Sequence, residues 1–130
     1  MPEATPGWPA PLLVFLGGGL GAVLRYLLSA WLSGYEWGRS FPWATLLINV
    51  LGSFVLGLIA ALLADRPGWK LFFGVGVCGG FTTFSTFSLD AWKLLESARY
   101  GAAAGYVLGS VVGGLLGAWV GLKMFPKNGG

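Results

Sequence analysis

The stretch CGGFTTFSTFS at residues 78–88 decides the fold, because it places helix-breaking and polar residues inside a hydrophobic span. The surrounding apolar segment has no charged residue between Lys70 and Asp90. Adjacent glycines and adjacent threonines are poor helix formers, and residues 80–88 include five hydroxyl side chains. The motif therefore predicts a helix broken near residues 79–83. In a membrane, such backbone is tolerated only where it is buried in protein or lines a watery cavity.

The composition around this motif is that of a membrane protein. Of the 130 residues, 55% are hydrophobic, 10% are charged and 23 are glycine, whereas about a quarter of a soluble domain is charged. Four apolar stretches approach the roughly 20 residues that span a bilayer; they lie at about residues 12–32, 43–64, 70–97 and 102–122. We expect an all-α membrane protein, a single transmembrane domain over residues 1–130 with a broken third helix and both termini on one side.

Neutral polar side chains recur within the second and fourth spans. Thr45, Asn49 and Ser53 follow one another at intervals of four, and Tyr106 and Ser110 do the same. Their amide and hydroxyl groups donate hydrogen bonds, so such a row can replace the water around a small anion without trapping it. The alternative is that they join helices, at about 0.6 kcal/mol per bond. We favour this alternative for Ser53 and the anion-binding role for Asn49.

Arg25 is the only charge deep within a hydrophobic span. It lies seven residues before Leu32, roughly 10 Å from that end of the helix, so its guanidinium can reach toward water. Two roles remain open: it anchors the helix, or its field draws anions into a vestibule.

The broken segment offers two kinds of ion ligand. Phe81, Phe84 and Phe87 recur every three residues, and the positive edge of an aromatic ring can rest against an anion. A stripe of phenylalanines more often faces lipid or core, but serines and threonines alternate with these rings. Free backbone carbonyls at a broken span suit a hard cation such as Na⁺.

The fourth span carries a row of glycines at a strict interval of four: Gly101, Gly105, Gly109, Gly113, Gly117 and Gly121. Bare backbone along one row of a helix allows another helix to approach closely. The row therefore predicts close helix packing, and leaves open whether the partner is another span or another subunit.

Several classes of function are disfavoured. The eight basic residues are spread singly, without the cluster that binds nucleic acid. The chain has no histidine and one cysteine, Cys78, which disfavours zinc sites and Cys–His nucleophiles. The carboxylates lie near helix ends, so we do not expect an enzyme.

The loops show almost no charge bias that would fix one orientation in the membrane. One side carries four basic residues, Arg66, Lys70, Lys123 and Lys127; the other carries Arg39, Lys93 and Arg99, with Arg25 nearer to it. Since an excess of Lys and Arg in cytoplasmic loops sets orientation, this chain is expected to insert both ways. The alternative is a single orientation chosen by the insertion machinery.

Three sequence stretches resemble the Fluc/CrcB family of fluoride channels. They are GGFTTFSTFS at residues 79–88, INVLGS at 48–53 and GAVLRY at 21–26. The first is highly specific, and the resemblance covers all four spans in order, roughly residues 12–123. It implies an antiparallel, dual-topology homodimer in the bacterial inner membrane, with two fluoride pathways. It also implies that fluoride leaves the cell passively, which lowers its toxicity.

The resemblance also implies the residues of the site. Phe84 and Phe87 would be the pore phenylalanines and Asn49 the polar residue of the second helix. The other expected pore residues are Thr83, Ser85, Tyr106, Ser110 and Arg25. The backbone carbonyls of Gly79 and Thr82, from both subunits, would hold a central Na⁺. Gly114 departs from the pattern, because relatives can carry Ser or Thr there, so the inner polar track is thinner here.

Two other functions compete with the fluoride channel. A small multidrug transporter is also a four-span, dual-topology dimer, but proton-coupled export requires an acidic residue inside the bundle. The first two spans have none, and Asp90 lies just past the broken segment. A membrane scaffold would explain the glycine row but not the polar row at Asn49. Without the resemblance, the residues indicate a small channel or transporter for a small anion.

Overall fold

The computed structural model describes residues 8–125, which form helices joined by short connections. Four helical segments are long and apolar enough to cross a membrane. They are α1 (Ala10–Ser33), α3 (Trp43–Leu62), a composite third segment (Pro67–Glu96) and α7 (Tyr100–Lys123). This confirms the all-α, four-span prediction. A short helix, α2 (Glu36–Ser40), lies in the connection between the first two spans.

The third span is assembled from four pieces. These are α4 (Pro67–Lys70), the π-helical η1 (Leu71–Cys78), α5 (Gly79–Phe81) and α6 (Phe84–Glu96). Thr82 and Thr83, between α5 and α6, have extended backbone, with ψ angles of 158° and 117°. Gly79 and Gly80 remain helical. The chain therefore leaves the helix at the two threonines, where β-branched side chains favour extended backbone.

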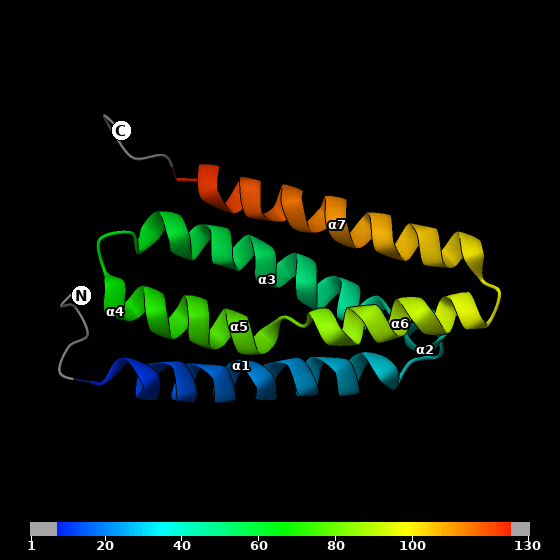
Figure 1. Cartoon of the computed structure of the whole chain (residues 1–130), viewed down its shortest axis with the longest axis horizontal. Coiled ribbons are helices and arrows are strands. Elements are labelled where there is room, and N and C mark those ends of the chain that lie inside the picture. The colour runs from blue at the N-terminus through cyan, green and yellow to red at the C-terminus, as the bar shows by residue number, and fades with distance from the viewer. Residues whose placement is uncertain (1–7, 126–130) are drawn as a thin grey trace.

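The spans lie side by side with α3 and the third span between α7 and α1 (Figure 1). The first residues of α1 and the last residues of α7 lie at the same end of the bundle, and α2 lies at the other end. The main helix pairs are α3 with α7 and α1 with η1 and α5. The interruption of the third span lies near the middle of the bundle, where α3 and α1 flank it.

Small residues allow both helix pairs to pack backbone against backbone. In α1, a Cβ atom at Gly17 or Gly21 would collide with the backbone of η1. In the glycine row of α7, Gly117 and Gly121 meet the backbone of α3, whereas Gly101 and Gly105 have open space. The C-terminal half of the row thus packs against α3 of the same chain. For that half, the partner is therefore another span of the chain.

Candidate functional site

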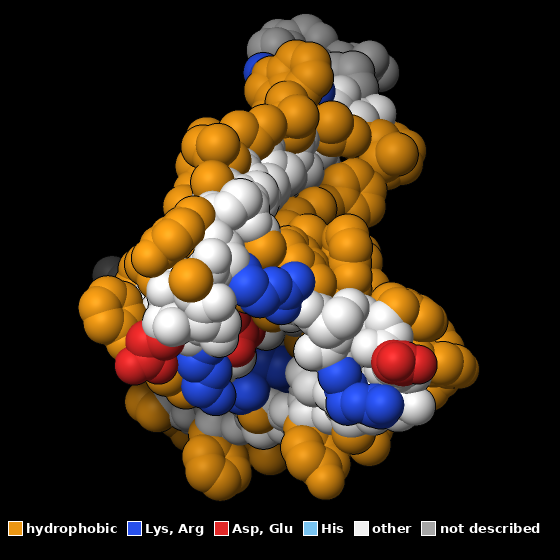
Figure 2. Space-filling view, turned by 90° about the vertical axis from the view of Figure 1, so that its right-hand side faces the viewer, with side chains coloured by type: hydrophobic (Ala, Val, Ile, Leu, Met, Phe, Trp, Pro, Cys, Tyr) orange, Lys and Arg blue, Asp and Glu red, His pale blue; other side chains and the backbone are white. Residues whose placement is uncertain are grey.

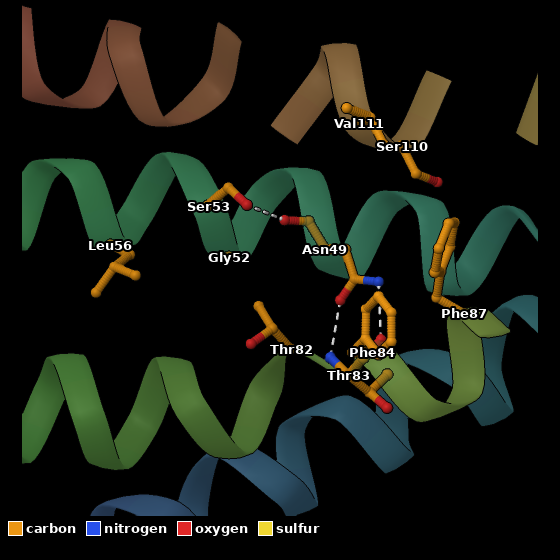
Figure 3. Close-up of a pocket in the computed structure, with 10 residues that line it drawn as sticks. All are labelled: Asn49, Gly52, Ser53, Leu56, Thr82, Thr83, Phe84, Phe87, Ser110 and Val111. Carbon is orange, nitrogen blue, oxygen red and sulfur yellow. Dashed lines mark hydrogen bonds between the residues drawn. The ribbon is translucent and has the colours of Figure 1, made fainter. Parts of the chain in front are cut away.

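A groove lined by both polar and apolar residues opens beside the interruption of the third span. Its volume is about 310 Å³, and it lies between α3, α6 and α7 (Figure 3). It is lined by Asn49, Gly52, Ser53, Leu56, Thr82, Thr83, Phe84, Phe87, Ser110 and Val111. None of these side chains carries a charge. The groove therefore offers hydrogen-bond donors and aromatic rings from three different elements.

The side chain of Asn49 holds the extended backbone of Thr83 by two hydrogen bonds. The Thr83 N–H donates to Asn49 Oδ1 at 2.8 Å, and Asn49 Nδ2 donates to the Thr83 carbonyl at 3.0 Å. Asn49 Oδ1 thus replaces the acceptor that the Thr83 N–H would have in a continuous helix, and Nδ2 adds a donor to the Thr83 carbonyl, which as the N-cap of α6 also accepts the first bond of that helix. Since unpaired backbone groups cost several kcal/mol in a membrane, Asn49 stabilises the interruption. One N–H of its amide remains for another acceptor.

The N-terminus of α6 begins directly at the groove. The Thr83 hydroxyl caps this helix by accepting a hydrogen bond from the Thr86 N–H at 3.2 Å. The positive end of the helix dipole, roughly half an elementary charge, therefore lies beside Phe84. Helix N-termini with free N–H groups attract anions. The electrostatics of this end of the groove favour a small anion.

The two groove phenylalanines stand one turn apart on α6. Their ring centroids are 5.8 Å apart, and the ring planes are inclined at 44°. Phe84 is 78% exposed, whereas Phe87 packs against Tyr106 with a centroid distance of 5.2 Å. Large exposure of Phe84 in a single subunit leaves the ring free to contact an ion or another protein surface.

Ser110 presents an unpaired hydroxyl to the groove. Its Oγ is buried and has no hydrogen-bond partner among residues 8–125. By contrast, the Ser53 hydroxyl donates to the carbonyl of Asn49 on its own helix at 2.7 Å. Buried polar atoms are nearly always paired, so the Ser110 hydroxyl is the lining group most in need of a ligand.

Arg25 contacts the interruption from the opposite side. Its Nε donates to the carbonyl of Gly80 in α5 at 3.1 Å, and its side chain is half-buried. The guanidinium therefore holds α1 against the last turn before the break, instead of extending to the end of its span. Arg25 does not line the groove, but it adds a positive charge to this part of the membrane.

The carbonyls expected to bind Na⁺ lie at the same interruption. Gly79 is exposed in the last helical turn, and Thr82 follows the end of α5. Helix C-termini expose carbonyl oxygens and carry the negative end of the dipole. These are suitable donors for a hard cation. Residues 8–125 contain no group of three or more His, Cys, Asp or Glu residues that could hold a metal, so a cation here would depend on carbonyls.

Five of the eight expected pore residues line the groove: Asn49, Thr83, Phe84, Phe87 and Ser110. Ser85 is exposed outside it. Tyr106 is fully buried, and its hydroxyl donates to Asp90 Oδ2 at 3.2 Å. That hydroxyl proton is therefore engaged by a carboxylate, and Tyr106 shapes the groove through its ring against Phe87.

Ser53 also lines the groove, although its hydroxyl was expected to join helices. Its interval of four after Asn49 is the signal that could have identified it, because this interval places both on one helix face. Gly114 stands opposite, where an added Cβ would lie 3.5 Å from the Ser53 hydroxyl. This is ordinary van der Waals contact, so the groove has room for a small side chain at position 114.

These features define a class of protein: a small four-span membrane protein with an uncharged, donor-lined groove at an interrupted helix. Residues 12–122 match the family described as CrcB-like protein, Camphor Resistance (CrcB). The chain belongs to this family, which confirms the resemblance found in the three sequence stretches.

Similar proteins in several bacteria are named fluoride-specific ion channel FluC. One from Leptospira interrogans is 46% identical over 122 residues, which cover 90% of this chain and 94% of the relative. One from Methylobacterium nodulans is 45% identical, covering 91% and 97%. One from Rhodopseudomonas palustris is 50% identical over 117 residues, covering 87% and 94%. The similarity thus extends over nearly the whole length of each protein.

Proposed function

We propose that this chain is a fluoride channel, as the names of its relatives state for them, and that fluoride passes through it passively. The observation that carries the proposal is the groove itself. A helix N-terminus, two phenylalanine rings and the unpaired hydroxyl of Ser110 surround one uncharged space. Partial charges of this kind can replace the hydration of a small anion, while the absence of a full positive charge in the lining lets it leave.

The channel works by conduction and not by chemistry. Its relatives are named as ion channels, which agrees with the expectation that the chain is not an enzyme. Fluoride would leave the bacterial cell down its gradient through the inner membrane, and cytoplasmic fluoride would fall. The multidrug-transporter alternative lacks support, because the groove has no acidic lining residue to couple protons.

The decisive experiment is fluoride efflux from liposomes that contain the purified protein. A fluoride electrode records the release of fluoride after a potassium ionophore is added, because the ionophore dissipates the membrane potential that would otherwise stop fluoride efflux. We expect efflux well above that of protein-free liposomes, and little chloride efflux from the same preparation. A preparation that is folded and inserted but releases no fluoride would leave only the scaffold function.

We propose further that two chains form an antiparallel homodimer. The groove opens to the outside of one subunit, and the Phe84 ring and the Ser85 hydroxyl are exposed beside it. Open polar surface facing lipid is costly, so a second copy would cover it. The balanced basic residues of the loops support insertion in both orientations.

A labelling experiment tests dual insertion. Cys78 is buried and is replaced by serine, and Asn128→Cys supplies one reactive thiol on the side of the C-terminus. A membrane-impermeant thiol reagent is applied to intact cells and then after lysis. Labelling of about half the molecules before lysis supports the antiparallel dimer. Labelling of all or none before lysis contradicts it.

The dimer would also complete a structural Na⁺ site. One subunit offers the carbonyls of Gly79 and Thr82, and a second antiparallel copy would offer the same pair. Hard cations prefer oxygen ligands, and a Na⁺ held by four carbonyls around a two-fold axis would offset the negative charge at the ends of two α5 helices. Flux recorded in Na⁺ and in a large organic cation such as N-methyl-D-glucamine tests whether this cation is needed.

A further inference from the structure

A second cavity lies at the end of the bundle that holds α2. Its volume is about 380 Å³, and it is an open hollow bordered by α2, the second half of α6 and the connection to α7. In Figure 2 this end faces the viewer, and blue basic side chains surround a hollow. The cavity shares no lining residue with the groove beside the interruption. It therefore needs an explanation of its own.

The cavity has a net positive lining. Arg39, Lys93 and Arg99 line it, against a single acidic residue, Asp90. The Asp90 carboxylate is half-buried and accepts the hydrogen bond from the Tyr106 hydroxyl on α7. Lys93 is exposed and makes no ion pair with any residue in the described range 8–125. Three cationic side chains against one carboxylate give the lining a net positive charge, which favours an anionic ligand.

Both arginines are fixed in place by backbone carbonyls. An Nη atom of Arg39 donates to the Ser33 carbonyl at 2.9 Å, and one of Arg99 donates to the Ser40 carbonyl at 2.6 Å. A guanidinium has five N–H donors, so each retains donors for a ligand. A fixed guanidinium binds phosphate oxygens in pairs, and pinning it beforehand reduces the entropy that binding would cost.

The cavity lies at the depth of the lipid headgroups. Its lining comes from the ends of the membrane-spanning helices, at Ser33, Pro42 and Ser97. Trp31, Trp37 and Trp43 surround this end and are 60%, 53% and 44% exposed. Such rings gather at the membrane–water interface. A phosphate presented by the membrane surface is thus within reach of the cavity.

A layer of buried side chains separates the cavity from the groove. The Tyr106 ring has no exposed surface, and it packs against Phe41 at 5.6 Å and Phe87 at 5.2 Å between centroids. This layer disfavours the cavity as a continuation of the ion path.

We propose that this cavity binds the phosphate group of an anionic phospholipid through Arg39, Lys93 and Arg99. The bound headgroup would tie α2 and the α6–α7 connection to the membrane surface. The proposal depends on the chain lying in a membrane, not on fluoride conduction. Inorganic phosphate offers the same chemistry without the membrane, and the experiment distinguishes the two sources.

The test is thermal unfolding of the full-length protein in a neutral detergent. Short-chain phosphatidylglycerol, short-chain phosphatidylcholine and inorganic phosphate are titrated separately. We expect phosphatidylglycerol alone to raise the unfolding temperature in a saturable way. Lys93→Gln, which breaks no contact within the protein, should weaken the apparent affinity about five-fold, the equivalent of roughly 1 kcal/mol per basic residue. Lys123→Gln, at the opposite end of the bundle, is the matched control and should leave affinity unchanged.

Three results would overturn the proposal. An equal response of Lys93→Gln and the unmodified protein would remove the cavity as the binding site. An equal response to inorganic phosphate would remove the lipid as the source. A fluoride efflux that falls in Lys93→Gln within pure phosphatidylcholine liposomes would assign the cavity to the ion path. Loss of folding in Lys93→Gln is recognised from its unfolding temperature without ligand, and Lys93→Met then supplies the neutral variant.

Discussion

Replacing Asn49 by aspartate changes the fewest atoms at the interruption and should have the largest effect. The substitution keeps the oxygen that accepts from the Thr83 N–H. It replaces the Nδ2 donor by a second oxygen, which then faces the Thr83 carbonyl at the 3.0 Å of the present hydrogen bond. It also introduces a full negative charge into a groove that we propose conducts an anion.

The two effects have different sizes. Losing the Nδ2 donor costs the Thr83 carbonyl one of its two hydrogen bonds, since it still accepts within α6, which is about 0.5–1.5 kcal/mol of stability. An anion about 6 Å from the new carboxylate would be repelled by about 3 kcal/mol at an effective dielectric constant of about 20. Since about 1.4 kcal/mol corresponds to a factor of ten, we expect fluoride flux to fall by about a hundredfold. The fall in flux should exceed what any partial loss of folded protein explains.

Flux and folding are therefore measured on the same preparation. Fluoride efflux from liposomes is normalised to the fraction of monodisperse protein in gel filtration. Asn49→Ser keeps a hydroxyl donor but is too short to bridge both groups of Thr83, so we expect partial flux. Lys123→Gln, which lies outside the groove lining in the last turn of α7, is the control. If Asn49→Asp conducts within a factor of two of the unmodified protein, the charge argument and the place of Asn49 beside the ion path are both wrong.

Three further predictions follow from the groove and the helix packing. Phe84→Ile or Phe87→Ile keeps an apolar side chain but loses the positive ring edge, so fluoride efflux should fall severely while the gel-filtration profile stays normal. Near-normal efflux in both variants would show that these rings only contribute to packing. Gly121→Ala forces a Cβ against the α3 backbone and should lower the free energy of unfolding, measured with denaturant, by about 1–3 kcal/mol. Gly105→Ala adds a Cβ in open space and should leave that free energy unchanged, so equal losses in the two variants would refute the packing. Gly114→Ser adds a hydroxyl where there is room, so folding should be retained and efflux should change by less than about tenfold; misfolding would show that the space is occupied in the membrane.

The sequence predicts the spans well because hydrophobic length is a local property. Each expected span begins and ends within a few residues of its helix, and the threonines of the 78–88 motif mark the interruption. The role of Asn49 is not local. Its amide pairs with the backbone of Thr83, 34 residues away in the sequence. The interval of four between polar residues shows which of them share a face of α3, but not which other segment that face contacts.

The residues that the sequence placed less well are those whose partners come from other helices. Tyr106 shares the row of Ser110, yet its hydroxyl is engaged by Asp90 on α6. For Arg25 the sequence left two roles open, to anchor the helix or to draw anions, and it could not show that the side chain donates to Gly80 across the α1–α5 contact. In both cases a buried polar group finds the nearest acceptor on a neighbouring helix, and that neighbour depends on the packing of the whole bundle.

The direction of α6 explains how a nearly uncharged groove can favour an anion. Thr83 turns the chain so that a 13-residue helix begins at the groove, and its positive end carries roughly half an elementary charge. A lysine in the same place would bind a small anion too firmly for rapid release, because a full charge in low dielectric interacts strongly. An acidic side chain would exclude the anion, and the groove lining contains none. The carboxylate of Asp90, on the same helix, accepts the hydroxyl of Tyr106 outside the groove. The N-terminus of α6 therefore supplies a weak positive field without a charged side chain in the groove lining, as selective but rapid conduction requires.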